Sequence, residues 1–186
     1  MARSICAVVL AVCVWWWFAN TGEHGVVQAD GSLAYPDYTF SNYERFEIEG
    51  VVLSTRTYSH DREAELSPVD IAIGWGALSN PEVRAQLSIS QRNRWFYWRA
   101  AQLPIPAREI NRNATNIHII PGDEQVRAQL KELAADQHIR LIGQLVDVQG
   151  EDGWRWRSSR SRTDTGQGSC ELLLLEKIES RYGQLI

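Results

Sequence analysis

The sequence predicts a mainly β domain of the α+β class: a small OB-like or related β-barrel with one clear helix inserted before the last three strands. Residues 138–178 alternate in hydropathy over three segments that two glycine-containing turns separate. Earlier stretches of the chain show the same two-residue alternation. Between the two groups of strands, residues 124–136 have apolar side chains at helical spacing.

The last three strands are marked by alternation and by turn residues. Residues 138–148 have one apolar and one mixed face, as expected for a strand buried on one side. Residues 150–153 supply a hairpin turn that ends in Asp-Gly. Residues 154–157 alternate tryptophan with arginine, so the two kinds of side chain point to opposite faces. A looser turn at 165–168 leads to the final strand at 170–178.

The first part of the domain, beginning near Glu44, is expected to hold four strands and two short helical segments. A helix from Pro81 to about Leu87 follows Asn80, which is a good N-terminal cap. A turn of helix is expected at 107–112. The expected strands cover residues 44–58, 69–76, 94–99 and 116–120.

An apolar run near the N-terminus predicts a membrane segment. Residues 5–19 are uninterrupted by charge, and extending the run to Gly22 gives a length within the spanning range. A cleaved signal peptide is the alternative. Trp17-Phe18-Ala19 does not fit a cleavage site, and Val27-Gln28-Ala29 fits by residue type but lies far from the apolar core. We favour an uncleaved anchor. Arg3 precedes the run and no lysine or arginine follows it before Arg45, which directs the N-terminus to the cytoplasm.

These observations predict the organisation and location of the chain. Residues 1–22 form a transmembrane anchor or signal segment, 23–43 a tether and 44–180 a β-barrel-like soluble domain. The protein is expected to be single-pass in a bacterial inner membrane, with its membrane contact through residues 5–22 and its domain in the periplasm.

Composition limits the classes of partner. The 186 residues are 44% hydrophobic and 23% charged, which suits one domain with a real core. A net charge of −4 is unlike that of a general nucleic-acid-binding protein, so any anion site must be a local patch. Lys131 and Lys177 are the only lysines among 19 basic residues. Arginine suits bidentate anion binding, but a GC-rich genome is the simpler cause of this bias.

Several short motifs lie along the soluble part of the chain. They are VDIAIGWG at 69–76, SQRNRW at 90–95, PIP at 104–106 with REI at 108–110, HIIP at 118–121, DGWRWRSS at 152–159, and DTG at 164–166 with Gly168 and Cys170-Glu171. On these motifs the chain, from about Glu47 to Glu176, resembles an uncharacterised family of small bacterial proteins with an N-terminal membrane segment and a β-rich soluble domain. The resemblance implies a membrane-tethered domain and carries no activity and no catalytic residue.

No standard catalytic, phosphate-binding or metal-binding motif is present in the sequence. Weak catalytic candidates are His118 as a general base, with Asp164, Glu171 or Cys170 nearby. A buried strand cysteine is the commoner role for Cys170. The four histidines lack metal-ligand spacing, so we expect no metal and no cofactor.

The strongest candidate for a binding surface combines aromatic and basic side chains. Tryptophans beside a positive groove can stack on single strands or sugars while arginines hold the anionic groups. In the opposing interpretation the tryptophans fill the core and the arginines face solvent. A bulge at Ser158-Ser159 would bring Arg160 and Arg162 into one positive stripe with the arginines at 155 and 157. The ligand-binding candidates are Arg94, Trp95, Trp154, Arg155, Trp156 and Arg157.

Three functions follow from these features. The favoured one is a periplasmic binding or accessory domain of an envelope complex, with a protein partner and an anionic ligand such as a nucleic acid or glycan. The second is a hydrolase that uses His118. The third is a purely structural subunit of a membrane complex. An enzyme is the less favoured class because no catalytic signature is present.

Overall fold

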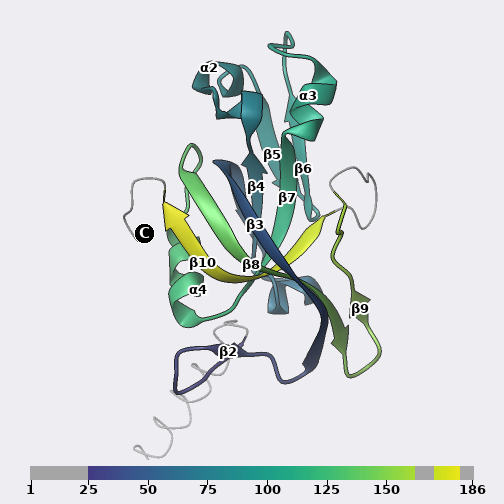
Figure 1. The fold of residues 1–186 in the computed structure, drawn as a ribbon. Helices are drawn as coiled ribbons and strands as arrows, with labels where there is room; N and C mark the ends of the chain where they lie inside the picture. The colour runs from purple at the N-terminus through teal and green to yellow at the C-terminus, as the bar shows by residue number, and fades with distance from the viewer. Residues whose placement is uncertain (1–24, 162–169, 181–186) are drawn as a thin grey trace, which may run out of the picture.

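The computed structural model describes residues 25–161 and 170–180, and it confirms the prediction of a mainly β domain. Ten strands and five short helices make up this part of the chain (Figure 1). The strands are β1 Val26–Val27, β2 Leu33–Ala34, β3 Tyr38–Thr57, β4 Val69–Gly74, β5 Ser88–Arg92, β6 Trp95–Arg99, β7 Ala114–Pro121, β8 His138–Gly150, β9 Arg155–Trp156 and β10 Glu171–Ser180. The helices are η1 Arg62–Glu65, η2 Gly76–Ser79, α2 Pro81–Arg84, α3 Ala107–Arg112 and α4 Glu124–Glu132.

Six of the strands form the main sheet, in the order β10-β7-β4-β3-β8-β9. β3 pairs with β8 along its first part and with β4 along its last part, both antiparallel. β10 pairs parallel with β7 and antiparallel with β8. Each of β3, β4, β7, β8 and β10 therefore has a strand partner on both sides. β9 pairs only with β8 among the described strands and lies at the margin of the sheet (Figure 1).

One face of this sheet carries the largest apolar cluster. Alternate residues of β4, β7 and β10 point to it, and α4 adds apolar side chains from its buried face. The cluster contains Phe46, Ile48, Val52, Val69, Ile71, Ile73, Ile117, Ile119, Val126, Leu130, Leu133, Ile139, Leu141, Leu145, Leu173, Leu175 and Ile178.

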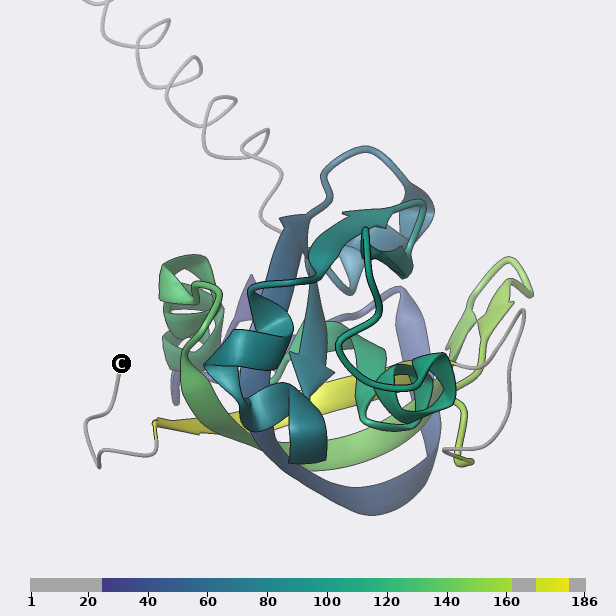
Figure 2. The ribbon, with the colours of Figure 1, turned by 90° about the horizontal axis from the view of Figure 1, so that it is seen from above.

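Two smaller clusters lie on the opposite face. One gathers Val146, Val148 and Leu172 beneath Trp154 and Trp156. The other is covered by the β5–β6 hairpin and by α2 and α3, which lie together at one end of the sheet in Figures 1 and 2. Polar side chains of β4 and β7 on this face are thus enclosed between two apolar clusters, which is the setting of the site described below.

Local sequence signals account for the helices. Asp123 caps α4 by accepting a hydrogen bond from the backbone N–H of Val126, and Asn80 caps α2 through Glu82. α4 ends at Glu132, before the predicted residue 136, because Leu133 is extended and Asp136 donates its N–H to the carbonyl of Val52.

Other boundaries differ more. β3 begins at Tyr38, so residues 38–43 of the predicted tether belong to a strand. β5 was not anticipated, because the predicted helix was extended to Leu87 and the next strand was expected only from Arg94. Within residues 25–161 and 170–180, no helix is long and apolar enough to cross a membrane. The predicted anchor at 5–22 lies outside the described residues.

Candidate functional site

Pairing of two strands sets a buried acid opposite a buried histidine. Asp70 on β4 and His118 on β7 are direct antiparallel partners, and their side chains share the face away from the largest cluster. Asp70 is fully buried and His118 is 5% exposed. His118 Nδ1 lies 2.9 Å from Asp70 Oδ1 without the alignment of a hydrogen bond. The contact is therefore electrostatic and becomes an ion pair when the imidazole is protonated.

Arg94 supplies the permanent counter-charge to Asp70. Its Nη1 donates to Asp70 Oδ1 at 2.9 Å and to the carbonyl of Ser67 at 2.8 Å, and its Nη2 donates to Asp61 at 2.5 Å. The guanidinium also lies 3.8 Å from the centre of the Tyr58 ring. Burial raises the pKa of Tyr58, whose hydroxyl accepts the backbone N–H of Arg94. A buried carboxylate is tolerable only with such partners.

The backbone at Arg94 is strained. Asn93 and Arg94 are the two loop residues of the β5–β6 hairpin, and both have positive φ, 50° and 66°. A two-residue turn with this geometry prefers glycine at its second position. The side chain of Arg94 is therefore held in a costly conformation by its contacts with the Asp70 network.

Amide side chains extend the network into the hairpin. Asn116 accepts from Gln91 at 2.7 Å and donates to the carbonyl of Arg94 at 3.1 Å. Gln91 in turn accepts from the hydroxyl of Ser54 at 2.7 Å. All of these groups are buried or partly buried, so the hairpin is fixed to the sheet by satisfied polar contacts.

A cavity of about 600 Å³ opens beside this network. Seven residues singled out from the sequence line it, together with Glu63. Those seven are Arg94, Trp95, His118, Arg155, Trp156, Arg157 and Cys170. His118 and Trp156 meet inside it with ring centres 5.0 Å apart. The cavity therefore combines a buried imidazole, indole rings and exposed guanidinium groups.

The arginines around β9 fall into two kinds. Arg155 and Arg157 are exposed and form no ion pair with any residue in the described part of the chain. Arg160 instead contacts Glu44 and Asp147 and donates to two backbone carbonyls. It is a structural residue and does not extend a positive stripe. Arg162, the fourth member of the predicted stripe, lies outside the described residues.

Other predicted residues are placed differently. Trp154 is half-buried, packs against Trp156 and does not line the cavity. Both tryptophans cover the apolar cluster under β9. Each side chain is therefore partly a core residue, as in the interpretation that the tryptophans fill the core. Glu171 accepts a hydrogen bond from Thr115 and is not the partner of His118. Asp164 lies outside the described residues. Within the described ranges, no three His, Cys, Asp or Glu side chains are grouped to hold a metal ion.

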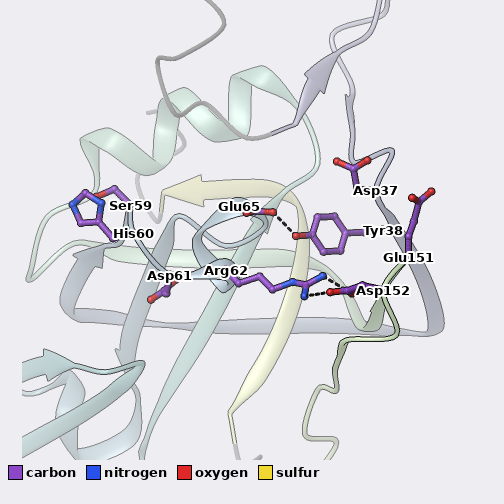
Figure 3. Close-up of a pocket in the computed structure, with 9 residues that line it drawn as sticks. All are labelled: Asp37, Tyr38, Ser59, His60, Asp61, Arg62, Glu65, Glu151 and Asp152. Carbon is purple, nitrogen blue, oxygen red and sulfur yellow. Dashed lines mark hydrogen bonds and ion pairs between the residues drawn. The ribbon is translucent and has the colours of Figure 1, made fainter.

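A second, acidic cavity of about 590 Å³ lies on the other side of η1 (Figure 3). Arg62 crosses it and donates to both oxygens of Asp152, while its guanidinium lies 4.7 Å from the Trp154 ring. Tyr38 donates to Glu65 on the opposite wall. The polar groups that point inward in Figure 3 thus bond one another, which ties the 150–153 turn to η1.

Sequence reasoning missed Asp70 as a site residue. A signal was available: Asp70 interrupts an otherwise apolar strand, and His118 interrupts another. Two polar residues on buried strands need partners, so their pairing could have been anticipated. The strand register that sets Asp70 opposite His118 depends on the long connection between β4 and β7. This register could not be predicted from the sequence.

Replacing Arg94 with Ala is expected to lower the free energy of unfolding by about 3–5 kcal/mol, because Asp70 would remain as a poorly compensated buried charge. Arg92→Ala, at the neighbouring exposed arginine stacked on Tyr97, should cost less than about 1 kcal/mol. Urea denaturation of the two variants and of Asp70→Asn/Arg94→Ala provides the measurement. Equal stability of the two single variants would contradict this description of the network.

The Arg62–Asp152 pair predicts a weak acid dependence of stability. The two hydrogen bonds from Arg62 lower the pKa of Asp152 from 3.8 to about 2. Since the folded-state pKa is the lower one, the stabilisation is complete above pH 3.8 and is lost as the pH falls through about 2. Asp152→Asn should therefore lower the Tm slightly at pH 7, and the difference from wild type should vanish near pH 2. Glu151→Gln, on the same turn, should show no such convergence when both are followed by circular dichroism.

Comparison with known proteins adds no relative from which a role for these residues could be transferred. No protein-family model matches the chain, and no curated protein and no solved structure matches it.

Proposed function

We propose that this protein is a membrane-tethered accessory domain of the bacterial cell envelope and binds an anionic ligand in the cavity beside β9. One observation carries the proposal. Arg155 and Arg157 are exposed and without ion pairs among the described residues, and they stand at a cavity walled by Trp95 and Trp156. Arginines that form no ion pair and lie beside half-buried indoles are suited to an anionic group attached to a ring.

The proposed scaffold is an OB-like barrel. In support, β3, β4, β7, β10 and β8 each pair on both sides, and α4 lies between β7 and β8 in sequence. Folds of this kind bind extended ligands on an open face between loops. The membrane tether and the periplasmic location rest on the apolar run at 5–22 and on the position of Arg3. A purely structural subunit is the alternative, and it would need residues 1–43 for assembly but no cavity.

Binding should depend on the two free arginines. Arg155→Ala/Arg157→Ala is expected to weaken binding of anionic probes by about tenfold or more, since each guanidinium contributes charge-assisted hydrogen bonds. The probes are tetragalacturonate, a heparin tetrasaccharide and an eight-residue thymidine oligonucleotide, measured by calorimetry at low and high salt. Cys170 lines the same cavity, so a bound probe should also slow its alkylation, followed by peptide mass spectrometry.

The matched control is Arg108→Ala/Arg112→Ala, which removes two exposed arginines from α3 and changes the net charge equally. It should bind as the wild type does. The proposal fails if no probe binds the full chain, or if both double variants lose affinity alike. Loss of stability without loss of binding in Arg155→Ala/Arg157→Ala would mark those arginines as structural.

A second function, hydrolysis, is favoured by the contact of His118 with Asp70. The carboxylate can orient the imidazole and stabilise its protonated form while the other ring nitrogen takes a proton from water. That water would attack the phosphorus of an anionic ester held by the arginines. The bond from phosphorus to the ester oxygen would break, and the imidazolium would return its proton to the leaving alcohol. The contact is not aligned in the free protein, but such bonds often tighten only when substrate is bound.

Hydrolysis of bis(4-nitrophenyl) phosphate tests this second function. If His118 is the base, His118→Gln should lower the rate by about 10²- to 10⁴-fold, while His60→Gln, at an exposed histidine outside this cavity, should leave it unchanged. Calorimetric binding of tetragalacturonate to His118→Gln, run in parallel, reports whether the cavity is intact. Absence of turnover in the wild type, or equal rates in His118→Gln and the wild type, would exclude catalysis by His118 on this substrate.

A further inference from the structure

β9 stands between two cavities. The strand pairs with Val148 and Gln149 of β8 on one edge only, within the part of the chain that the structure describes. The larger cavity is the one lined by Trp95, Trp156 and His118. A smaller cavity of about 250 Å³ is formed with β3 and β8, and it is lined by Ser41, Asn42, Asp147, Val148, Gln149, Arg155 and Arg157.

Arg155 and Arg157 line both cavities. The two free guanidinium groups therefore mark a boundary that one ligand can cross, with an anionic group on the arginines and a neighbouring unit on each side. A small anion confined to the larger cavity would leave the smaller one unused.

The two cavities differ in chemistry. The larger has indole rings and the carboxylate of Glu63. The smaller has the hydroxyl of Ser41, the amide of Gln149 and the carboxylate of Asp147. Burial raises the pKa of Asp147, but hydrogen bonds from Asn42, Arg160 and the backbone N–H of Ser158 lower it overall and occupy both carboxylate oxygens. Ser41 and Gln149 are exposed, and hydroxyl and amide groups of this kind exchange hydrogen bonds with sugar hydroxyl groups.

We propose that the ligand is an acidic oligosaccharide that crosses β9. This inference rests on the proposed anion-binding function and names its ligand class. One sugar ring lies against Trp156, its acidic group is held by Arg155 and Arg157, and the next sugar unit places its hydroxyl groups on Ser41 and Gln149.

The lining of the smaller cavity favours sugars over a nucleic-acid strand. A single strand is held by stacking of its successive bases on aromatic side chains. None of the seven described residues that line the smaller cavity is aromatic. A sugar unit needs no second ring there, because its hydroxyl groups can exchange hydrogen bonds with the hydroxyl of Ser41 and the amide of Gln149.

The test compares chain lengths on the full-length protein in detergent. Tetragalacturonate and a heparin tetrasaccharide should each bind about tenfold tighter than galacturonic acid and a heparin disaccharide, because the longer ligands add hydrogen bonds in the smaller cavity. Ser41→Ala/Gln149→Ala should remove this advantage and leave binding of the short ligands unchanged. Ser88→Ala/Gln102→Ala, at exposed positions on other elements, is the matched control and should retain it.

The outcomes separate the two proposals. If the short and long saccharides bind equally, or if Ser41→Ala/Gln149→Ala has no effect, the oligosaccharide inference is wrong while anion binding stands. If the thymidine oligonucleotide binds and the saccharides do not, the ligand class is wrong. If no anion binds at all, both proposals fall together.

Discussion

The Asp70 carboxylate is fully buried, and much of the outer face of the sheet is arranged to make that burial tolerable. Arg94 must reach it, which fixes the β5–β6 hairpin over β4 even at the cost of a left-handed backbone. Asn116 and Gln91 then bond the rest of the hairpin to the sheet. One charge thus determines where a whole hairpin sits and where the cavity wall that carries Trp95 is built.

The alternating tryptophans and arginines of β9 serve two purposes. The tryptophans cover apolar residues of β8, and this packing holds a very short strand at the sheet margin. Since the indoles face inward, Arg155 and Arg157 face outward, and they form no ion pair with any residue in the described part of the chain. The same alternation that stabilises the strand therefore presents the free cations, so neither interpretation of this motif excludes the other.

Most elements could be predicted from local signals: the capped helix at Asp123, the Asp-Gly turn before β9 and the alternating strands. The β5 strand was hidden because Ser88 to Arg92 has a weak apolar pattern and follows a capped helix start. Several candidate residues were found because aromatic and basic clusters are visible in sequence. Asp70, the partner of His118, was not found, because it lies 48 positions away in the sequence and the pairing depends on strand register. Whether an arginine is free or paired, as with Arg157 and Arg160, likewise depends on acids that approach from distant strands.

The position of β10 has a consequence for how the chain reaches its native state. This strand joins β7 to β8, and its parallel pairing sets Leu172 beside His118, far apart in sequence. Neither β7 nor β8 can complete its hydrogen bonding until residues 171–180 have emerged and returned to the sheet. Pairing between strands that are far apart in sequence is slow, because the entropy cost of closing the long loop between them comes before the favourable contacts form. A chain that emerges from its N-terminal end during synthesis would therefore leave β7 and β8 incompletely paired until β10 has formed.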